Sequence, residues 1–152
     1  MGFVVKEINK NNFRSRRDLI GRIGLIVYSF ESTYPEIKTW FLSKVNPGLK
    51  SGERSILYVL DGDKIVGLSI LKDSELEKKI CTFYISPEAR GKGLADVLFK
   101  ESFTKLNTEK PIISVPEHAL QRFNKYIVQY QFYQTESRFL NSSRLEFVYN
   151  GR

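Results

Sequence analysis

The chain has very few of the residues from which disulfide networks and metal centres are built. Its 152 residues include one cysteine, Cys81, and one histidine, His118. A single cysteine excludes an internal disulfide. One cysteine and one histidine also cannot supply the usual ligands of a tetrahedral zinc site, so we expect no bound metal.

Long hydrophobic runs are lacking as well. No apolar stretch approaches the about 20 residues needed to span a bilayer. Residues 1–6 show no charged region followed by an apolar core, and Lys6 stands where a myristoylation signal needs serine or threonine. We therefore expect a cytoplasmic protein without membrane attachment.

What the chain does contain is the composition of a globular domain, with 41% hydrophobic and 13% aromatic residues. No linker or repeat divides it, which predicts a single domain over residues 1–152. A net charge of +7 favours polyanionic partners. A solvated basic face is the ordinary explanation for its charge clusters, and contact with nucleic acid is the alternative. The clustered residues are Arg14, Arg16, Arg17 and Arg22, and then Lys44, Lys50 and Arg54.

Hydrophobic periodicity predicts an α/β (α+β) fold with a mixed central sheet of about six or seven strands flanked by helices. The expected order is βααβββαβαββ. A helical crossover over 94–107 implies a locally parallel pair of strands. The expected strands are 3–8, 55–60, 64–71, 79–85, 111–115, 132–139 and 144–149. The expected helices are 12–30, 34 to about 46–48, 94–107 and 119–130. Turns are expected at Asp61-Gly62 and through 141–143.

The segment 85–95 joins the expected strand 79–85 to a helix through a glycine-spaced turn. The first N–H groups of a helix have no intrahelical acceptor, and the helix dipole adds positive charge there, so a phosphate fits such a site. Glycines allow the main chain to approach a diphosphate closely, and basic neighbours add charge. The segment therefore predicts a phosphate cradle made of Arg90, Gly91, Lys92, Gly93, Leu94 and Ala95.

Arg90, Gly93 and Ala95 fit the R-x-x-G-x-(G or A) pattern that holds the pyrophosphate of acetyl-CoA in GNAT-type N-acetyltransferases. The order of elements also resembles that family over nearly the whole chain. The resemblance implies the GNAT fold, acetyl-CoA as co-substrate and direct attack of an amine on the thioester. It further implies that the thioester carbonyl and the pantetheine bond to the main chain near Phe83 and Ile85, where this strand splays from 112–115.

A general base is less easily assigned. Many relatives carry a glutamate where this chain has Lys79, and Glu77, two residues away, is more simply a solvated charge. His118 follows the expected strand 111–115 and could serve as the base, or it could be an exposed loop residue. Cys81 could be an acylated nucleophile, although a buried strand cysteine is the commoner case.

The general acid of relatives is often a tyrosine in a Tyr-x-x-x-Gly-Phe pattern. Counting back from Phe132 places Ile127 at that position, and Gln131 replaces the glycine. Tyr126 lies one place away and Tyr130 is the next candidate. Both lie on the apolar side of a helix, where a tyrosine is more often part of the core.

The leading hypothesis is an acetyl-CoA-dependent N-acetyltransferase that acts on a primary amine of a small molecule, peptide or protein. One alternative is a non-catalytic module that binds acyl-CoA, suggested by Lys79 and the displaced tyrosines. Another is an acetyltransferase for an RNA-linked amine, which only the basic residues of the expected first helix support. The sequence identifies neither the amine nor whether two chains form a homodimer.

Overall fold

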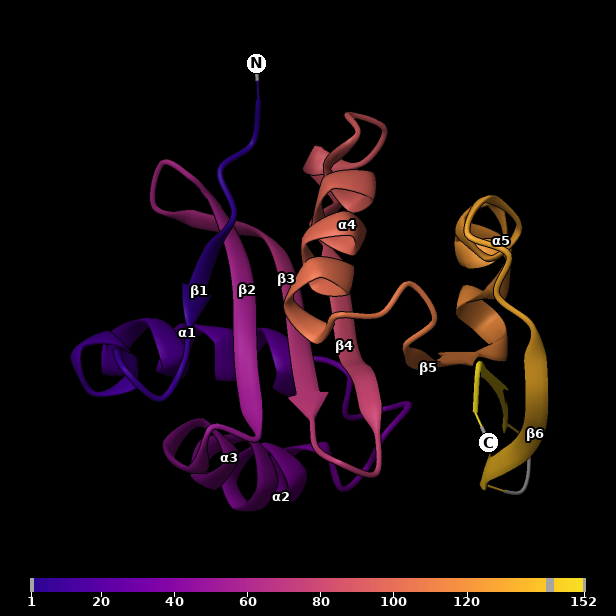
Figure 1. Cartoon of the computed structure of the whole chain (residues 1–152), viewed down its shortest axis with the longest axis horizontal. Helices are drawn as coiled ribbons and strands as arrows, with labels where there is room; N and C mark the ends of the chain where they lie inside the picture. Colours follow the sequence, from indigo (N-terminus) through magenta and orange to yellow (C-terminus); the bar gives the residue numbers. More distant parts are fainter. Residues whose placement is uncertain (1, 142–143, 152) are drawn as a thin grey trace.

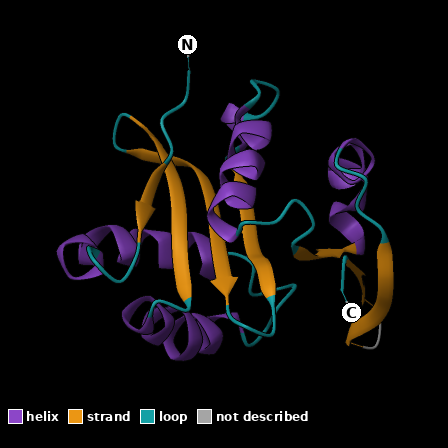
Figure 2. Ribbon diagram, in the orientation of Figure 1, coloured by secondary structure: helices purple, strands orange, loops and turns teal. Residues whose placement is uncertain are grey.

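A seven-stranded mixed sheet in the order β1-β2-β3-β4-β5-β7-β6 forms the centre of the molecule (Figures 1 and 2). The computed structural model describes residues 2–141 and 144–151. Strands β1 to β4 form an antiparallel meander, β5 lies parallel to β4, and β7 and β6 continue antiparallel. The strands are β1 Lys6–Ile8, β2 Arg54–Asp61, β3 Lys64–Asp73, β4 Lys78–Ile85, β5 Ile112–Pro116, β6 Gln134–Asn141 and β7 Arg144–Tyr149.

Helices cover both faces of this sheet. The first group consists of the 3₁₀ turn Phe13–Arg16, α1 Arg17–Tyr28, α2 Ile37–Trp40, the π-helical turn Phe41–Val45 and α3 Asn46–Ser51. The second group consists of α4 Leu94–Leu106 and α5 Leu120–Gln129, preceded by the 3₁₀ turns Pro87–Ala89 and Glu117–Ala119. Figure 1 shows α4 lying along β3 and β4, with β5 and α5 beyond it. None of the helices in the described ranges is long and apolar enough to cross a bilayer.

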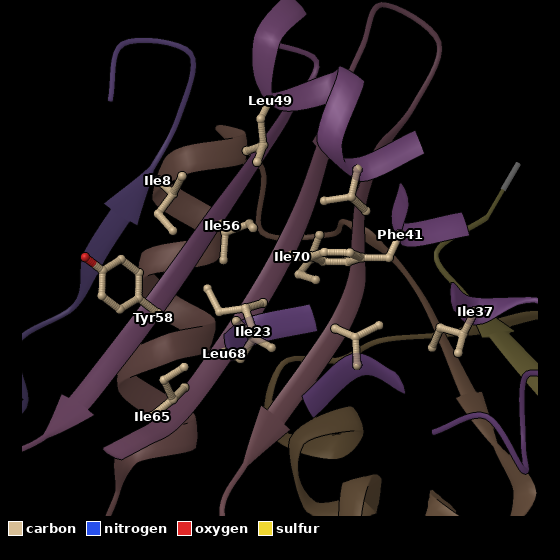
Figure 3. Packing of buried hydrophobic residues seen from close by; sticks show 12 residues of the cluster. Ile8, Ile23, Ile37, Phe41, Leu49, Ile56, Tyr58, Ile65, Leu68 and Ile70 are labelled. Carbon is tan, nitrogen blue, oxygen red and sulfur yellow. The ribbon is translucent and has the colours of Figure 1, made fainter. Parts of the chain in front are cut away.

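Each face of the sheet has its own hydrophobic core. Alternation along β2 and β3 sends Ile56 and Ile70 to the face covered by α1 to α3, where Phe41 packs with them (Figure 3). The opposite face centres on Phe99 of α4, which is fully buried. Phe83 of β4 stacks on Phe99 with ring centroids 4.0 Å apart. The second core thereby reaches β4, the strand that leads to the expected phosphate cradle.

The observed order of elements and the parallel β4–β5 pair confirm the predicted fold. Several boundaries differ by a few residues. The first strand is shorter than predicted, the first α-helix begins only at Arg17 after a 3₁₀ turn, and the predicted helix end at 46–48 is wrong. Pro47 sits in the first turn of α3, where its missing N–H is tolerated, and the helix ends at Gly52 with φ 88°. Residues 142–143 of the predicted last turn lie outside the described residues.

Candidate active site

Strands β4 and β5 part soon after they meet. They pair only at Lys79 with Ile112 and at Ile80 with Ile113, although β4 continues to Ile85. The pairing of β4 with β3 changes register at Cys81. Ile80 and Thr82 pair with two successive residues of β3, so Cys81 between them has no partner and forms a β-bulge. The main-chain groups of 81–85 that point toward β5 therefore have no strand partner among the described residues.

A pocket of about 530 Å³ occupies this opening. One part of its lining comes from the face covered by α1 and α2, including Tyr34 and Trp40. The other part comes from the face covered by α4 and α5, including Phe83 and Phe123. Because residues from both faces line one pocket, the opening connects the two sides of the sheet.

The expected phosphate cradle lies between β4 and α4. Gly91 and Gly93 have φ angles of 76° and 83°, and a Cβ at either position would meet open space. Gly93 is the N-cap of α4, and no side chain caps this helix end within the described ranges. Leu94 and Ala95 bury their side chains in the cores, so only their main chain is offered to a ligand. Positive φ, open space and uncapped N–H groups together suit a diphosphate.

A second cation lies near this cradle and was not identified from the sequence. Partial burial of the Arg122 guanidinium, followed by the positive charge of Arg90, lowers the pKa of Arg122 below its ordinary value. Arg122 lines the pocket at the start of α5. Two cations that repel each other beside an open cradle fit a polyanionic ligand. Local sequence patterns do not reveal this pair, because the two arginines are 32 residues apart and belong to different elements.

Of the residues predicted to act as a base, His118 is well placed. It is exposed in the turn Glu117–Ala119 and lines the pocket. Lys79 and Glu77 also line the pocket, but Glu77 accepts a hydrogen bond of 2.8 Å from Lys72. That bond lowers the pKa of Glu77, which disfavours Glu77 as a proton acceptor near neutral pH. Among the described residues, no three histidine, cysteine, aspartate or glutamate side chains are grouped to hold a metal ion.

Tyr126 and Tyr130, the predicted acids, lie on α5 and at its end and are not among the pocket-lining residues. Both rings pack against Phe99. The Tyr130 hydroxyl donates to Asp96 of α4, and burial together with this bond raises the pKa of Tyr130. Their catalytic roles stay predictions, and the geometry shows that both tyrosines contribute to the core.

A different tyrosine does face the pocket. The Tyr34 hydroxyl donates to Oε2 of Glu146 at 2.6 Å, and Nε of Arg138 donates to Oε1 at 2.9 Å. Glu146 is only 3% exposed, and all three residues line the pocket. Burial, followed by the bond to Glu146, raises the pKa of Tyr34. The only sequence signal for these three residues was Glu146, the single acidic residue of the otherwise largely apolar strand β7.

The basic cluster at the N-terminus lies outside this pocket. Arg14 and Arg16 belong to the 3₁₀ turn, whereas Arg17 and Arg22 belong to α1, and all four are exposed. The explanation of a solvated face holds for them but is wrong for Arg54, which is 7% exposed and lines the pocket.

Cys81 offers a direct test of covalent catalysis. Burial raises the pKa of the Cys81 thiol despite the opposing positive charge of Arg54, so the thiol is protonated at neutral pH. We expect Cys81→Ala to retain most of the acetyl-transfer activity, measured as thiol release from acetyl-CoA. Mass spectrometry of the wild-type protein incubated with acetyl-CoA alone provides the check, since an acetyl group on Cys81 would contradict this expectation.

Comparisons with known proteins agree with this geometry. A comparison with curated protein sequences found no match. Among solved structures, one described as a GNAT-family acetyltransferase from Desulfovibrio desulfuricans is 11% identical, with 97% of each chain covered and a TM-score of 0.70. PaiA N-acetyltransferase from Thermoplasma acidophilum, in complex with coenzyme A, is 13% identical over 97% of this chain and 98% of that chain, with a TM-score of 0.62. The spermidine/spermine N-acetyltransferase SpeG from Vibrio cholerae is 15% identical over 97% and 93%, with a TM-score of 0.61.

At these identities the structural likeness shows the fold, which is that of the GNAT acetyltransferases. The sequence model of the acetyltransferase (GNAT) domain matches residues 31–126, more than half of the chain. The chain therefore belongs to the GNAT acetyltransferase family, as predicted from Arg90, Gly93 and Ala95, and its enzyme class is that of the acyltransferases.

Proposed function

We propose that residues 1–152 act as one domain that transfers an acetyl group directly from acetyl-CoA to a primary amine of a small molecule or peptide. The observation that carries this proposal is the pocket through the β4–β5 opening. In this proposal, acetyl-CoA enters the pocket from the α4 face and the amine enters from the α2 face. The two substrates meet inside the pocket. Solved relatives hold acetyl-CoA or CoA, including a streptothricin acetyltransferase from Bacillus anthracis with acetyl-CoA.

The residues of the cradle fit the diphosphate of acetyl-CoA. We assign its binding to the main chain of 91–95 and to the side chains of Arg90 and Arg122, because both glycines leave open space and both arginines lack a carboxylate within 4 Å among the described residues. The main chain near Phe83 and Ile85, which has no strand partner on the β5 side, is assigned to the pantetheine and the thioester carbonyl, although the Ile85 carbonyl accepts a hydrogen bond of 3.4 Å from Nε of Arg90. When bound, acetyl-CoA supplies an activated acetyl group as a thioester.

The chemistry asked of the protein is modest. A neutral amine nitrogen forms a bond to the acetyl carbon, the carbon–sulfur bond breaks, and the proton lost by the amine is balanced by protonation of the thiolate. In this proposal, main-chain N–H groups at the free edge of β4 stabilise the negative charge on the carbonyl oxygen. His118, at the pocket wall, is the proposed acceptor of the amine proton.

The alternatives differ in one measurement. Release of CoA thiol that depends on added amine supports the enzyme, whereas acetyl-CoA binding without such release supports a non-catalytic module. An RNA-linked acceptor is less favoured because Arg14, Arg16 and Arg17 lie outside the pocket. A cytoplasmic location and a homodimer stay sequence-based expectations.

The proposed role of His118 predicts that His118→Gln lowers turnover by about 100-fold with little change in CoA affinity. Steady-state thiol release and calorimetric titration with CoA measure the two effects. Glu117→Gln is the matched control, since Glu117 is exposed in the same turn and does not line the pocket. Full turnover in His118→Gln would remove His118 from the mechanism.

A further inference from the structure

Three cationic residues stand at directly opposite positions of neighbouring strands. Arg54 of β2 pairs with Lys72 of β3, and Lys72 pairs with Lys79 of β4. Opposite residues of antiparallel strands share a face of the sheet, and like charges at such positions destabilise it. All three line the pocket. Arg54, Lys72 and Lys79 thus form a cationic row across β2, β3 and β4.

Only one member of the cationic row forms an ion pair within the described residues. Lys72 bonds to Glu77 at 2.8 Å and lies 3.9 Å from Glu53. No carboxylate of the described residues lies within 4 Å of Arg54 or Lys79. Arg54 is nevertheless only 7% exposed. Glu77 lies close enough to interact electrostatically with Arg54 and Lys79 without forming an ion pair with either. A buried charge without a directly paired carboxylate is costly, so an anion bound at Arg54 would stabilise it.

The guanidinium of Arg54 is also held in place. The Cζ atom of Arg54 lies 5.6 Å from the centre of the Trp40 ring, and Nη1 of Arg54 donates a hydrogen bond of 3.2 Å to Sγ of Cys81. The stem of Arg54 runs so close to Gly48 that a Cβ there would lie 2.1 Å from the Arg54 Cγ. Gly48 therefore makes the space that Arg54 occupies. An arginine fixed in this way loses little conformational entropy when it binds a ligand.

We propose that Arg54 binds a carboxylate of the acceptor, so that the enzyme acetylates amines that also carry a carboxylate. This inference extends the proposed function and depends on it. The planar guanidinium can donate two parallel hydrogen bonds to a carboxylate, and Lys79 adds positive charge beside it. Because Arg54 contacts the bulge residue Cys81, the carboxylate is bound where the free edge of β4 begins. The acceptor is therefore compact, with amine and carboxylate a few bonds apart.

The same charges select against polycations. A polyamine would bring ammonium groups to the cationic row, and each would meet repulsion from Arg54 and Lys79. Spermidine, the substrate that names the Vibrio cholerae relative, is accordingly a poor acceptor in this proposal.

The first test compares matched acceptors on the wild-type protein. Thiol release is measured with α-amino acids and with their carboxamides, which keep the amine and remove the negative charge. We expect kcat/KM to be roughly 10- to 100-fold higher for the amino acids, the range of a hydrogen bond to a charged group. Equal or better rates with the carboxamides or with spermidine would overturn the proposal. A preference for phosphoethanolamine over both sets would overturn the carboxylate assignment.

The second test removes the guanidinium. Arg54→Gln should abolish the preference for amino acids over carboxamides, while Arg54→Lys should keep part of it. Arg14→Gln is the matched control, because Arg14 also lies 5.6 Å over an aromatic ring, that of Phe13, but is exposed and outside the pocket. A preference that survives in a folded Arg54→Gln, with CoA affinity intact, would exclude Arg54 as the anchor.

A binding readout separates this inference from the proposed function. Trp40 is the only tryptophan of the chain, so intrinsic fluorescence reports on the ring under Arg54. We expect a saturable change in Trp40 fluorescence on titration with the amino acid that reacts best, and no change with its carboxamide. If no amino acid reacts, each amino acid of the first test is titrated in turn. If no amine releases thiol but this change occurs, the acetyltransferase proposal fails and the carboxylate site stands. Thiol release without any such selectivity leaves the enzyme and overturns the site.

Discussion

Gly93→Glu is expected to weaken acetyl-CoA binding by about 100-fold or more. Gly93 has a φ of 83°, a left-handed conformation that costs a residue with a side chain about 1–2 kcal/mol. The added carboxylate also places negative charge at the N-terminus of α4, where the diphosphate is proposed to bind. Calorimetric titration with CoA measures the loss.

Gly62→Glu is the matched control for this experiment. Gly62 has a φ of 62° in the turn between β2 and β3, and a Cβ there would also meet open space. The control carries the same strain and charge at a different site, so it should bind CoA normally. Lys92→Ala should have a milder effect than Gly93→Glu. Unchanged affinity in Gly93→Glu would remove the diphosphate from this loop.

Phe99→Ala should produce the largest loss of stability. Phe99 is fully buried and packs against Phe83, Phe103, Tyr126 and other aromatic rings. Truncation of such a side chain costs about 3–5 kcal/mol in the free energy of unfolding, which lowers the melting temperature of a chain of this size by roughly 10 °C. Because Phe83 loses its stacking partner, weaker CoA binding should accompany the lower stability.

The control for this prediction is Phe139→Ala on β6. Phe139 is 72% exposed, so the same chemical change removes little buried surface. Its effect on unfolding should stay within about 0.5 kcal/mol. Denaturant unfolding of both variants, followed by circular dichroism, measures the difference. A loss below about 1 kcal/mol in Phe99→Ala would show that the core on the α4 face relaxes around the cavity.

The fold and the geometry of the loop before α4 were predictable because their signals are local. Gly91 and Gly93 lie in one short loop between a strand and a helix, and the structure gives both a positive φ. The parallel β4–β5 pair followed from a helical crossover between two apolar segments. In each case, neighbouring residues in the sequence carried the information.

The acceptor side of the pocket depends instead on pairing between distant strands. Arg54 looked like one member of a basic cluster, since nothing nearby in the sequence shows that Gly48 makes space for it or that Lys72 lies opposite. The bond between Tyr34 and Glu146 joins residues 112 positions apart. Tyr126 was selected by its spacing from Phe132, but helix packing turned its ring toward Phe99.

The short pairing of β4 with β5 creates an edge strand in the middle of a sheet. Edge strands normally lie at the margin, where water satisfies their polar groups or another chain can pair with them. Here the free edge over 81–85 is internal, flanked by the two halves of one sheet. A ligand that hydrogen-bonds along it would act as a structural insert that joins β1–β4 to β5–β7. Ligand affinity and the cooperativity of unfolding then measure the same contacts. With the ligand present at 100 times its Kd, the free energy of unfolding would rise by about 2.7 kcal/mol.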